Sequence, residues 1–458
     1  MTKEFEILLG LLNSNDSENI KKAFIDALNY RKEFEAHFDM TLEDYEELYF
    51  YLKTHERQEN WFEDNKYGDD FLEGIFMLDA IEYQDQKNIT FIPKSIKHLK
   101  ELKTLRYDSC GLIHLPKEIG ELSKLSKIEF NSNALQAIPK EIEFLQELSE
   151  LDLSDNELKS IPAEMGNLKN LTTLKLWGNE LKNIPKEIGT LNSLKVLDVG
   201  FNQLTDLPDE LASLKNLTHL TLSDSNFADL VSRENAIVWK IKSLVYLGVY
   251  RNNLKDISSK IGDLTNLEML ELQKNVLKDL PKEIGQLKNI THLYLHENKL
   301  KSLPKEIGNL HKLDWLQLND NELENLPKEM AGMKKLKVLF LANNQFQVFP
   351  QGLANMEILH FLDLTNNQIP SVPKEIGQLK KLDTLNLKEN LIEELPEEIG
   401  ELKDLEMLYL EKNPLKKFPT QLKNLKKLRA LFFDDIQKKQ FSKEIKALKM
   451  TNKLINFY

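Results

Sequence analysis

The sequence predicts an α/β solenoid, in which short strands from successive repeats stack into a parallel β-sheet. Three observations lead to this prediction. A phrase of leucine, two residues, leucine, one residue, leucine, two residues and asparagine recurs every 23 residues across most of the chain. Asn fills 12 of the 14 positions that close the phrase, and Cys110 and Ser225 fill the other two. Of the 15 prolines, 13 occupy one slot of the same period.

Residues 1–75 lack this phrase, and we predict that they form a small helical domain that caps the solenoid. Apolar residues recur at helical spacing from Ile20 to Leu28, and Thr41 followed by Asp44 is typical of a capping box that opens a second helix. The segment holds 19 Asp and Glu against 8 Lys and Arg, a balance of −11. Its many aromatic residues indicate a packed domain rather than a disordered acidic tail.

The solenoid is predicted to span residues 76–436, with about 14 regular repeats of 23 residues. In the first half of each repeat, strand alternation places residues such as Leu174 and Leu176 inward and Trp177 outward. Asn179 follows where the chain leaves the sheet, and its amide can pair with backbone groups that the turn leaves unpaired. We therefore expect stacked asparagines to form a structural ladder.

The second half of each repeat reads Leu-Pro-x-Glu-Ile-Gly-x-Leu, as in residues 303–310. Pro304 pre-sets φ and has no N–H, which suits the start of a short helical turn. Ile307 and Leu310 are three residues apart and are expected to point inward. Gly308 is expected to permit the return to the next strand. These residues therefore define the fold and not the function.

One repeat departs from the period, because 27 residues separate Ser225 from Asn252 and its proline is missing. This irregular repeat covers residues 226–251. Residues 226–243 are expected to form a longer convex excursion, with a helical turn over residues 235–239. Two interpretations stay open, namely a tolerated insertion and a functional bulge.

The chain closes with residues 437–458, which contain six lysines. We predict that this basic segment is a polar C-terminal cap, because the last strand of an open sheet needs its edge covered. The alternative is that the lysines bind a specific acidic partner.

This repeat wording resembles the leucine-rich repeat superfamily over about residues 92–430. The Leu-Pro half is similar to plant intracellular Ras-group-related leucine-rich repeat proteins and to the large families of leptospires and other bacteria. The resemblance implies a horseshoe with a parallel concave β-sheet, which usually binds partners by that face, and it does not imply an enzyme. Bacterial effectors of this superfamily that act as ubiquitin ligases have a separate catalytic domain with a nucleophilic cysteine. Cys110 lies in a ladder slot, so that role is not transferred to it.

Composition excludes several function classes. The net charge is −12, and the residues after 75 are nearly balanced, so the basic surface that nucleic-acid binding requires is missing. The apolar run from Ile7 to Leu12 is too short to cross a membrane and lacks the basic flank of a signal peptide. Cys110 is the one cysteine, which excludes an intramolecular disulfide. We expect a cytoplasmic, bacterial protein.

The outward strand positions are free to determine binding, and aromatic residues concentrate there. An exposed aromatic patch on a concave face is typical of a protein interface, although β-rich surfaces favour aromatic residues in any case. We predict that a protein partner binds this face. The candidate partner-binding residues are Trp177, Phe201, His219, Tyr246, Tyr250, Met269, His292, Tyr294, His296, Trp315, Phe340 and Phe361.

We predict no catalytic, cofactor-binding or metal-binding residues. His292 and His296 lie on one strand face, but positions i and i+4 of a strand are about 13 Å apart, too far for one metal ion. The sequence therefore favours a non-enzymatic protein-binding scaffold. The alternatives are an effector or toxin with activity in residues 1–75, where His37 and His55 are found, and an exported adhesin. The oligomeric state stays open.

Overall fold

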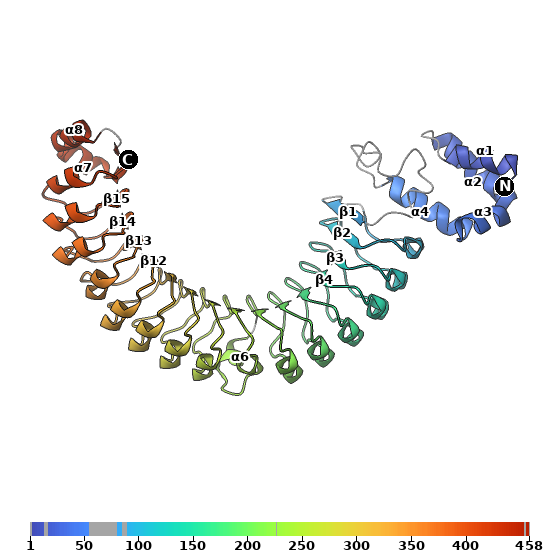
Figure 1. The fold of residues 1–458 in the computed structure, drawn as a ribbon, viewed down its shortest axis with the longest axis horizontal. Coiled ribbons are helices and arrows are strands. Elements are labelled where there is room, and N and C mark those ends of the chain that lie inside the picture. The colour runs from blue at the N-terminus through green and yellow to red at the C-terminus, as the bar shows by residue number, and fades with distance from the viewer. Residues whose placement is uncertain are drawn as a thin grey trace. The chain divides into compact units, whose positions relative to one another are not determined.

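The computed structural model describes residues 2–12, 17–54, 80–84, 89–225, 227–452 and 455–457. They group into two compact units, Met1–Leu217 (unit 1) and Thr218–Tyr458 (unit 2). In each unit, short strands alternate along the chain with 3-10 helices, and the strands line the inner side of the unit's curve (Figure 1). The predicted boundary between residues 75 and 76 lies outside the described residues.

Unit 1 begins with helices. They are α1 (Lys3–Leu12), α2 (Ser17–Ala27), the 3-10 helix η1 (Leu28–Tyr30), α3 (Arg31–Phe38) and α4 (Leu42–Thr54). Aromatic rings form their core, since the ring centroid of Phe34 lies 5.0 Å from that of Tyr45 and 6.5 Å from that of Phe5. The Asp44 N–H donates to Thr41 Oγ1 at 3.1 Å, so Thr41 caps α4. The predicted helical N-terminal region is confirmed.

Helix α4 packs against the first repeats of unit 1. Asp44 Oδ2 lies 2.9 Å from Lys97 Nζ and 2.9 Å from His98 Nε2. Deeper in the same contact, the buried hydroxyl groups of Tyr51 and Tyr107 are hydrogen-bonded at 2.8 Å. Helix α4 therefore covers buried residues of the first repeats that would otherwise face water.

The strands of unit 1 pair in parallel, each with the next along the chain. They are β1 (Ala80–Gln84), β2 (Thr104–Asp108), β3 (Lys127–Glu129), β4 (Glu150–Asp152), β5 (Thr173–Lys175) and β6 (Val196–Asp198). The 3-10 helices between and after them are η2 (Lys94–His98), η3 (Lys117–Glu121), η4 (Lys140–Phe144), η5 (Ala163–Asn167), η6 (Lys186–Thr190) and η7 (Asp209–Ser213).

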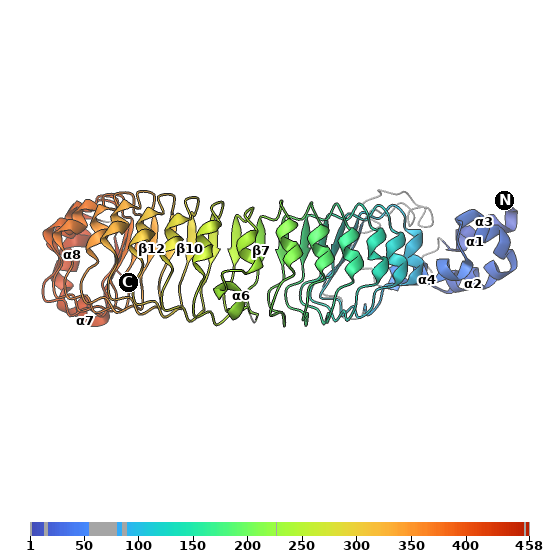
Figure 2. The same cartoon turned by 90° about the horizontal axis from the view of Figure 1, so that it is seen from below.

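Unit 2 continues the same pattern, and its strands also pair in parallel in chain order. They are β7 (His219–Thr221), β8 (Tyr246–Gly248), β9 (Met269–Glu271), β10 (His292–Tyr294), β11 (Trp315–Gln317), β12 (Val338–Phe340), β13 (Phe361–Asp363), β14 (Thr384–Asn386), β15 (Met407–Tyr409), β16 (Ala430–Phe432) and β17 (Asn456–Phe457). Figure 2 looks onto the 3-10 helices, which lie in a row within each unit. In unit 2 they are η8 (Ile237–Lys240), η9 (Ser259–Asp263), η10 (Lys282–Gln286), η11 (Lys305–Asn309), η12 (Lys328–Gly332), η13 (Gln351–Asn355), η14 (Lys374–Gln378), η15 (Glu397–Glu401) and η16 (Thr420–Asn424).

The predicted asparagine ladder is present. Asn298 Nδ2 donates to the carbonyl oxygens of Leu272 at 2.9 Å and Leu295 at 3.0 Å. Its Oδ1 accepts the N–H of Leu277 at 3.0 Å. Asn298 is buried, and the other ladder asparagines make equivalent bonds to the preceding repeat. Each amide therefore satisfies backbone groups that would be orphaned inside the solenoid.

The residue before each ladder position adopts a left-handed backbone, which the repeat phrase did not reveal. In the non-glycine cases φ lies between 49° and 57°, and Gly178 has a φ of 69°. The side chains in this row are mostly small, polar or charged, which suits an exposed turn. The exception is Phe201, a bulky aromatic residue with a φ of 49°.

The Leu-Pro half of each repeat forms a 3-10 helix, and the proline is its N-cap residue. Pro304, for example, has a φ of −63° and precedes η11. The reason for Gly308 differs from the expected return turn, because a Cβ at this position would overlap the carbonyl oxygen of Glu329 in the next repeat. Glycine therefore permits consecutive 3-10 helices to approach closely.

The irregular repeat contains two helical segments instead of the single turn expected over residues 235–239. Helix α6 (Ala228–Ser232) precedes η8, and the indole N–H of Trp239 donates to the carbonyl oxygen of Arg233 at 2.9 Å between them. Trp239 is buried. Ser225 is too short to replace the ladder asparagine, but its N–H still donates to Asn252 Oδ1 at 3.0 Å. The insertion is thus packed onto the solenoid.

The chain ends with helices α7 (Asp435–Gln440) and α8 (Ser442–Thr451), and β17 pairs with β16. The buried Gln437 takes over the ladder function, because its Nε2 donates to the carbonyl oxygens of Leu410 at 3.0 Å and Asn413 at 2.9 Å. These elements cover the apolar interior behind the last regular repeat.

Candidate functional site

The solvent-facing side of the strands, here called the concave face, differs in chemistry between the two units. In unit 1 its strand positions are rich in charge and form ion pairs, such as Lys175 with Asp152 at 3.1 Å and Lys127 with Glu150 at 3.3 Å. In unit 2, from β7 to β13, the outward strand residues with a formal charge are Glu271 and Asp363. The concave face of unit 2 is therefore the less polar of the two.

Five predicted residues of unit 2 form a continuous chain of rings on this face. The His292 ring lies 6.4 Å from the Tyr294 ring and 6.5 Å from the Trp315 ring, measured between centroids. Trp315 lies 5.4 Å from Phe340, which lies 4.7 Å from Phe361. These residues come from four adjacent strands, β10 to β13, and are partly exposed. Parallel pairing with one register holds the rings at contact distance.

The remaining predicted residues of unit 2 lie on neighbouring positions of the same face. His219 and Tyr246 stack with their ring centroids 5.7 Å apart. Met269 pairs in register with Tyr246 on one side and His292 on the other, so it links this stack to the ring chain. Tyr250 and His296 lie beyond the ends of their strands, at the third outward position of their repeats, and are partly exposed.

Buried polar atoms without a hydrogen-bond partner gather on this face. Within the part of unit 2 that the structure describes, four side chains have such an atom, namely Gln273 Oε1, His296 Nδ1, Trp315 Nε1 and Glu411 Oε2. All four occupy outward positions of their repeats. Burial lowers the pKa of His296, which disfavours its charged form. Unsatisfied polar groups in a folded protein call for an explanation, and a bound partner is one.

Two predicted residues lie in unit 1. The rings of Trp177 and Phe201 stack with centroids 5.3 Å apart and an angle of 25° between their planes. Phe201 is 54% exposed. They form an aromatic pair on an otherwise charged face.

The sequence prediction missed a second aromatic cluster in unit 2. Tyr409 and Phe432 stack with ring centroids 4.0 Å apart and nearly parallel planes, and Met407 is exposed beside them. Burial raises the pKa of Tyr409. Tyr409 occupies the same slot of its repeat as Tyr294, so extending the count of outward positions past residue 363 would have found it.

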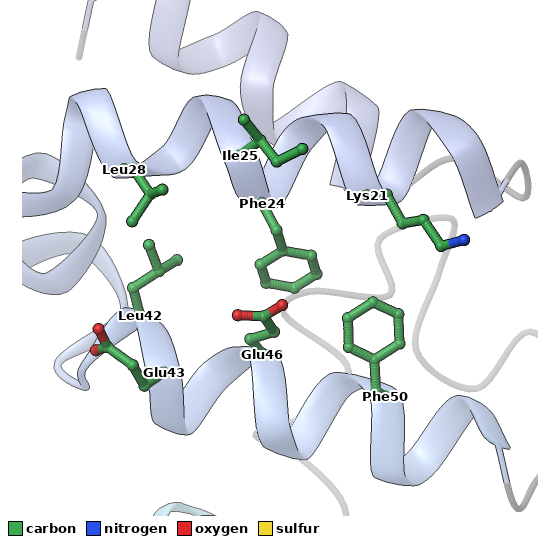
Figure 3. A pocket seen from close by; sticks show the side chains of 8 residues that line it. All are labelled: Lys21, Phe24, Ile25, Leu28, Leu42, Glu43, Glu46 and Phe50. Atoms are coloured by element: carbon green, nitrogen blue, oxygen red, sulfur yellow. The ribbon is translucent and has the colours of Figure 1, made fainter.

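The N-terminal helices contain a shallow hollow of about 350 Å³ between α2 and α4 (Figure 3). Ile25 and Leu28 line it and are 66% and 59% exposed. Its ionisable lining groups belong to Lys21, Glu43 and Glu46, and it contains no nucleophile paired with a base. His37 packs between the rings of Phe5 and Phe38, and His55 lies outside the described residues.

The part of the chain that the structure describes contains neither a metal-holding cluster nor a membrane-spanning helix. No group of three or more His, Cys, Asp or Glu side chains there has an arrangement that could hold a metal ion. None of the helices in these ranges has both the length and the apolar surface needed to cross a bilayer.

The chain matches two family models of repeat proteins. A model described as a leucine-rich repeat region matches residues 64–177, 289–367 and 358–457. A second model, described as a leucine rich repeat, matches residues 169–227 and 242–300. No curated protein sequence matches the chain.

Solved structures include similar proteins. A leucine-rich repeat protein of Leptospira interrogans is 32% identical with a TM-score of 0.66, over 84% of this chain and 97% of that one. The plant peptide hormone receptor RGFR1, solved in complex with RGF2, is 27% identical with a TM-score of 0.54, over 78% of this chain and 65% of the receptor chain. The functional domain of InlJ from Listeria monocytogenes is 18% identical with a TM-score of 0.55, over 79% and 68%, and shares the fold.

Proposed function

Because this chain belongs to the leucine-rich repeat family, we propose that it is a non-enzymatic scaffold that binds a protein partner on the concave face of unit 2. The ring chain from His292 to Phe361 is the observation that carries the proposal. Its leucine core lies on the opposite side of the strands, so the fold does not need these rings for burial. Contiguous exposed aromatic residues with little charge are typical of interface centres.

The similar proteins support a protein ligand in general. The plant receptor RGFR1 was solved with RGF2 bound, and leucine-rich repeat proteins are protein-binding scaffolds. We further propose a bacterial, cytoplasmic protein, because the Leptospira protein is a similar relative and the buried Cys110 is the one cysteine of the chain.

The test compares capture by three forms of the full chain from an extract of the cells that produce it, followed by quantitative mass spectrometry. The double variant Trp315→Ala with Phe340→Ala removes the centre of the ring chain. The control Phe144→Ala removes a phenyl ring like that of Phe340, and Phe144 is 59% exposed at the end of η4. We expect the double variant to lose the partner and the control to retain it, because truncating central aromatic residues typically costs 2 kcal/mol or more, about 30-fold in affinity.

Thermal unfolding separates loss of binding from loss of fold. Both side chains lie on the solvent side of the sheet, so the double variant should unfold near the wild-type temperature. If the folded double variant captures the same proteins in the same amounts as the wild type, the concave face of unit 2 is not the binding site.

A further inference from the structure

Three consecutive repeats of unit 1 surround Trp177 with a defined set of neighbours. The Asp155 N–H donates to the Trp177 carbonyl oxygen at 2.7 Å, and the Gly178 N–H donates to the Gly200 carbonyl oxygen at 3.1 Å. These bonds align the repeats beyond the ends of β4, β5 and β6. Trp177 therefore faces Gly200 across the repeat boundary, and Phe201 faces Gly178. A Cβ at residue 178 would lie 2.6 Å from Asp155 Oδ1, so glycine at this position lets the Asp155 carboxylate approach the repeat that carries Trp177.

Folding alone does not explain Phe201. Its left-handed backbone costs a bulky residue energy, and 54% of its surface is exposed, so burial does not repay that cost. The other non-glycine residues of the left-handed row of repeats are Ser109, Ser132, Asp155, Asp224, Arg251, Lys274, Glu297, Asp320, Asn343, Asn366, Glu389 and Lys412. All of these are polar or charged, so Phe201 is the aromatic exception in this row.

The charges near the ring pair are mainly negative. Asp198 is the last residue of β6, and its Oδ1 accepts the Gly200 N–H at 3.1 Å. Burial raises the pKa of Asp198, and no ion pair to it is found among the described residues. Lys175, the base on the neighbouring strand, pairs with Asp152 at 3.1 Å. Asp155 adds a further carboxylate beside Gly178. Lys175 attracts Asp198 only at a distance because it pairs with Asp152, so the partly buried Asp198 carboxylate can accept hydrogen bonds from a further cation.

We propose that Trp177, Phe201 and Asp198 form a site for an arginine side chain of the protein partner. The planar guanidinium stacks on the exposed ring of Phe201, where the negative face of the aromatic ring attracts a cation. Its N–H groups donate to the carboxylate of Asp198, which lies three residues before Phe201 in the chain. The inference rests on the proposed function in one respect, since the arginine belongs to the protein partner, and it adds a specificity for basic segments.

The experiment uses the full chain labelled with 5-fluorotryptophan and followed by fluorine NMR. The chain has four tryptophans, and the variant Trp177→Phe identifies the Trp177 signal. The probe is Nα-acetyl-arginine amide, and the matched control probe is the citrulline amide, which has the same shape without the charge. We expect the arginine probe to shift the Trp177 signal saturably, with a dissociation constant on the order of millimolar for so small a ligand. The citrulline probe should leave the signal unchanged.

Two variants test the named residues. Phe201→Asn removes the ring but keeps a side chain that tolerates the left-handed backbone, and Asp198→Asn removes the charge at nearly constant shape. Each should weaken arginine binding about fivefold, whereas Phe144→Asn, elsewhere in unit 1, should not. The proposal is overturned if both probes shift the Trp177 signal equally or if neither probe shifts it. It is also overturned if all four tryptophan signals shift equally, or if Asp198→Asn binds the arginine probe as well as the wild type does. The capture experiment with the Trp315→Ala and Phe340→Ala double variant is a separate measurement. The arginine site and the binding face of unit 2 can therefore fail independently.

Discussion

Replacing Asn298 with alanine should open the solenoid locally. The side chain makes three hydrogen bonds to buried backbone groups, two as donor and one as acceptor of the Leu277 N–H. At about 1 kcal/mol for each bond, the local free energy of opening falls by about 3 kcal/mol. Since 1.4 kcal/mol corresponds to a factor of ten, amide exchange at Leu277 should accelerate about 100-fold.

Hydrogen exchange with mass spectrometry measures this effect where it arises. A global unfolding midpoint is less informative, because each repeat of a solenoid contacts mainly its neighbours and the chain does not have to unfold in one step. Asn309→Ala is the matched control, because Asn309 is exposed in η11 and the substitution is chemically identical. Exchange in the peptide that contains Leu277 should rise for Asn298→Ala only. Equal exchange in the two variants would refute the view that the ladder asparagine stabilises the turn.

Three further predictions concern single positions. Gly308→Ala should lower the urea midpoint of unfolding, because the added Cβ would overlap the carbonyl oxygen of Glu329. Gly352→Ala is the control and should not lower it, because a Cβ added there lies 3.5 Å from the nearest atom. Equal midpoints for the two variants would argue against the close approach at Gly308. Phe201→Asn should raise the thermal midpoint, since it relieves about 1 kcal/mol of left-handed strain, and a lower midpoint contradicts that strain. Because burial lowers the folded pKa of His296, the unfolded chain binds its proton more tightly, and stability falls as pH drops through about 6.5. Urea titrations at pH 7 and pH 5 should show a smaller decline for His296→Gln, and an equal decline is evidence against this role.

The repeat period was sufficient to predict the strands, the buried leucines and the ladder. Its success has a physical reason, because residues such as Asn298 recur wherever the same backbone groups need a partner. The left-handed row was not predictable in this way. Its slot accepts Ser, Asp, Lys and Glu alike, so no single residue type marks the conformation.

The candidate site was predictable only as a set of outward positions. Alternation along the strand identified Trp315 and Phe361 as outward residues, but whether neighbouring rings touch depends on side-chain rotamers, which the period does not determine. The same limit explains the irregular repeat. Trp239 is buried, and its indole N–H donates to the carbonyl oxygen of Arg233, a contact made by two residues of the insertion that the 23-residue period does not predict.

The asparagine ladder also determines which changes in chain length by recombination preserve the hydrogen bonds between repeats. Leu300 hydrogen-bonds to Asn321 in the same way that Leu323 hydrogen-bonds to Asn344. Loss or duplication of one whole 23-residue segment therefore rejoins equivalent hydrogen-bonding groups, and an insertion within a repeat can also keep them paired, as Ser225 and Asn252 show. Changes of whole repeats thus lengthen or shorten the concave face in steps of one strand, about 4.8 Å each, and bring new outward residues side by side at every step.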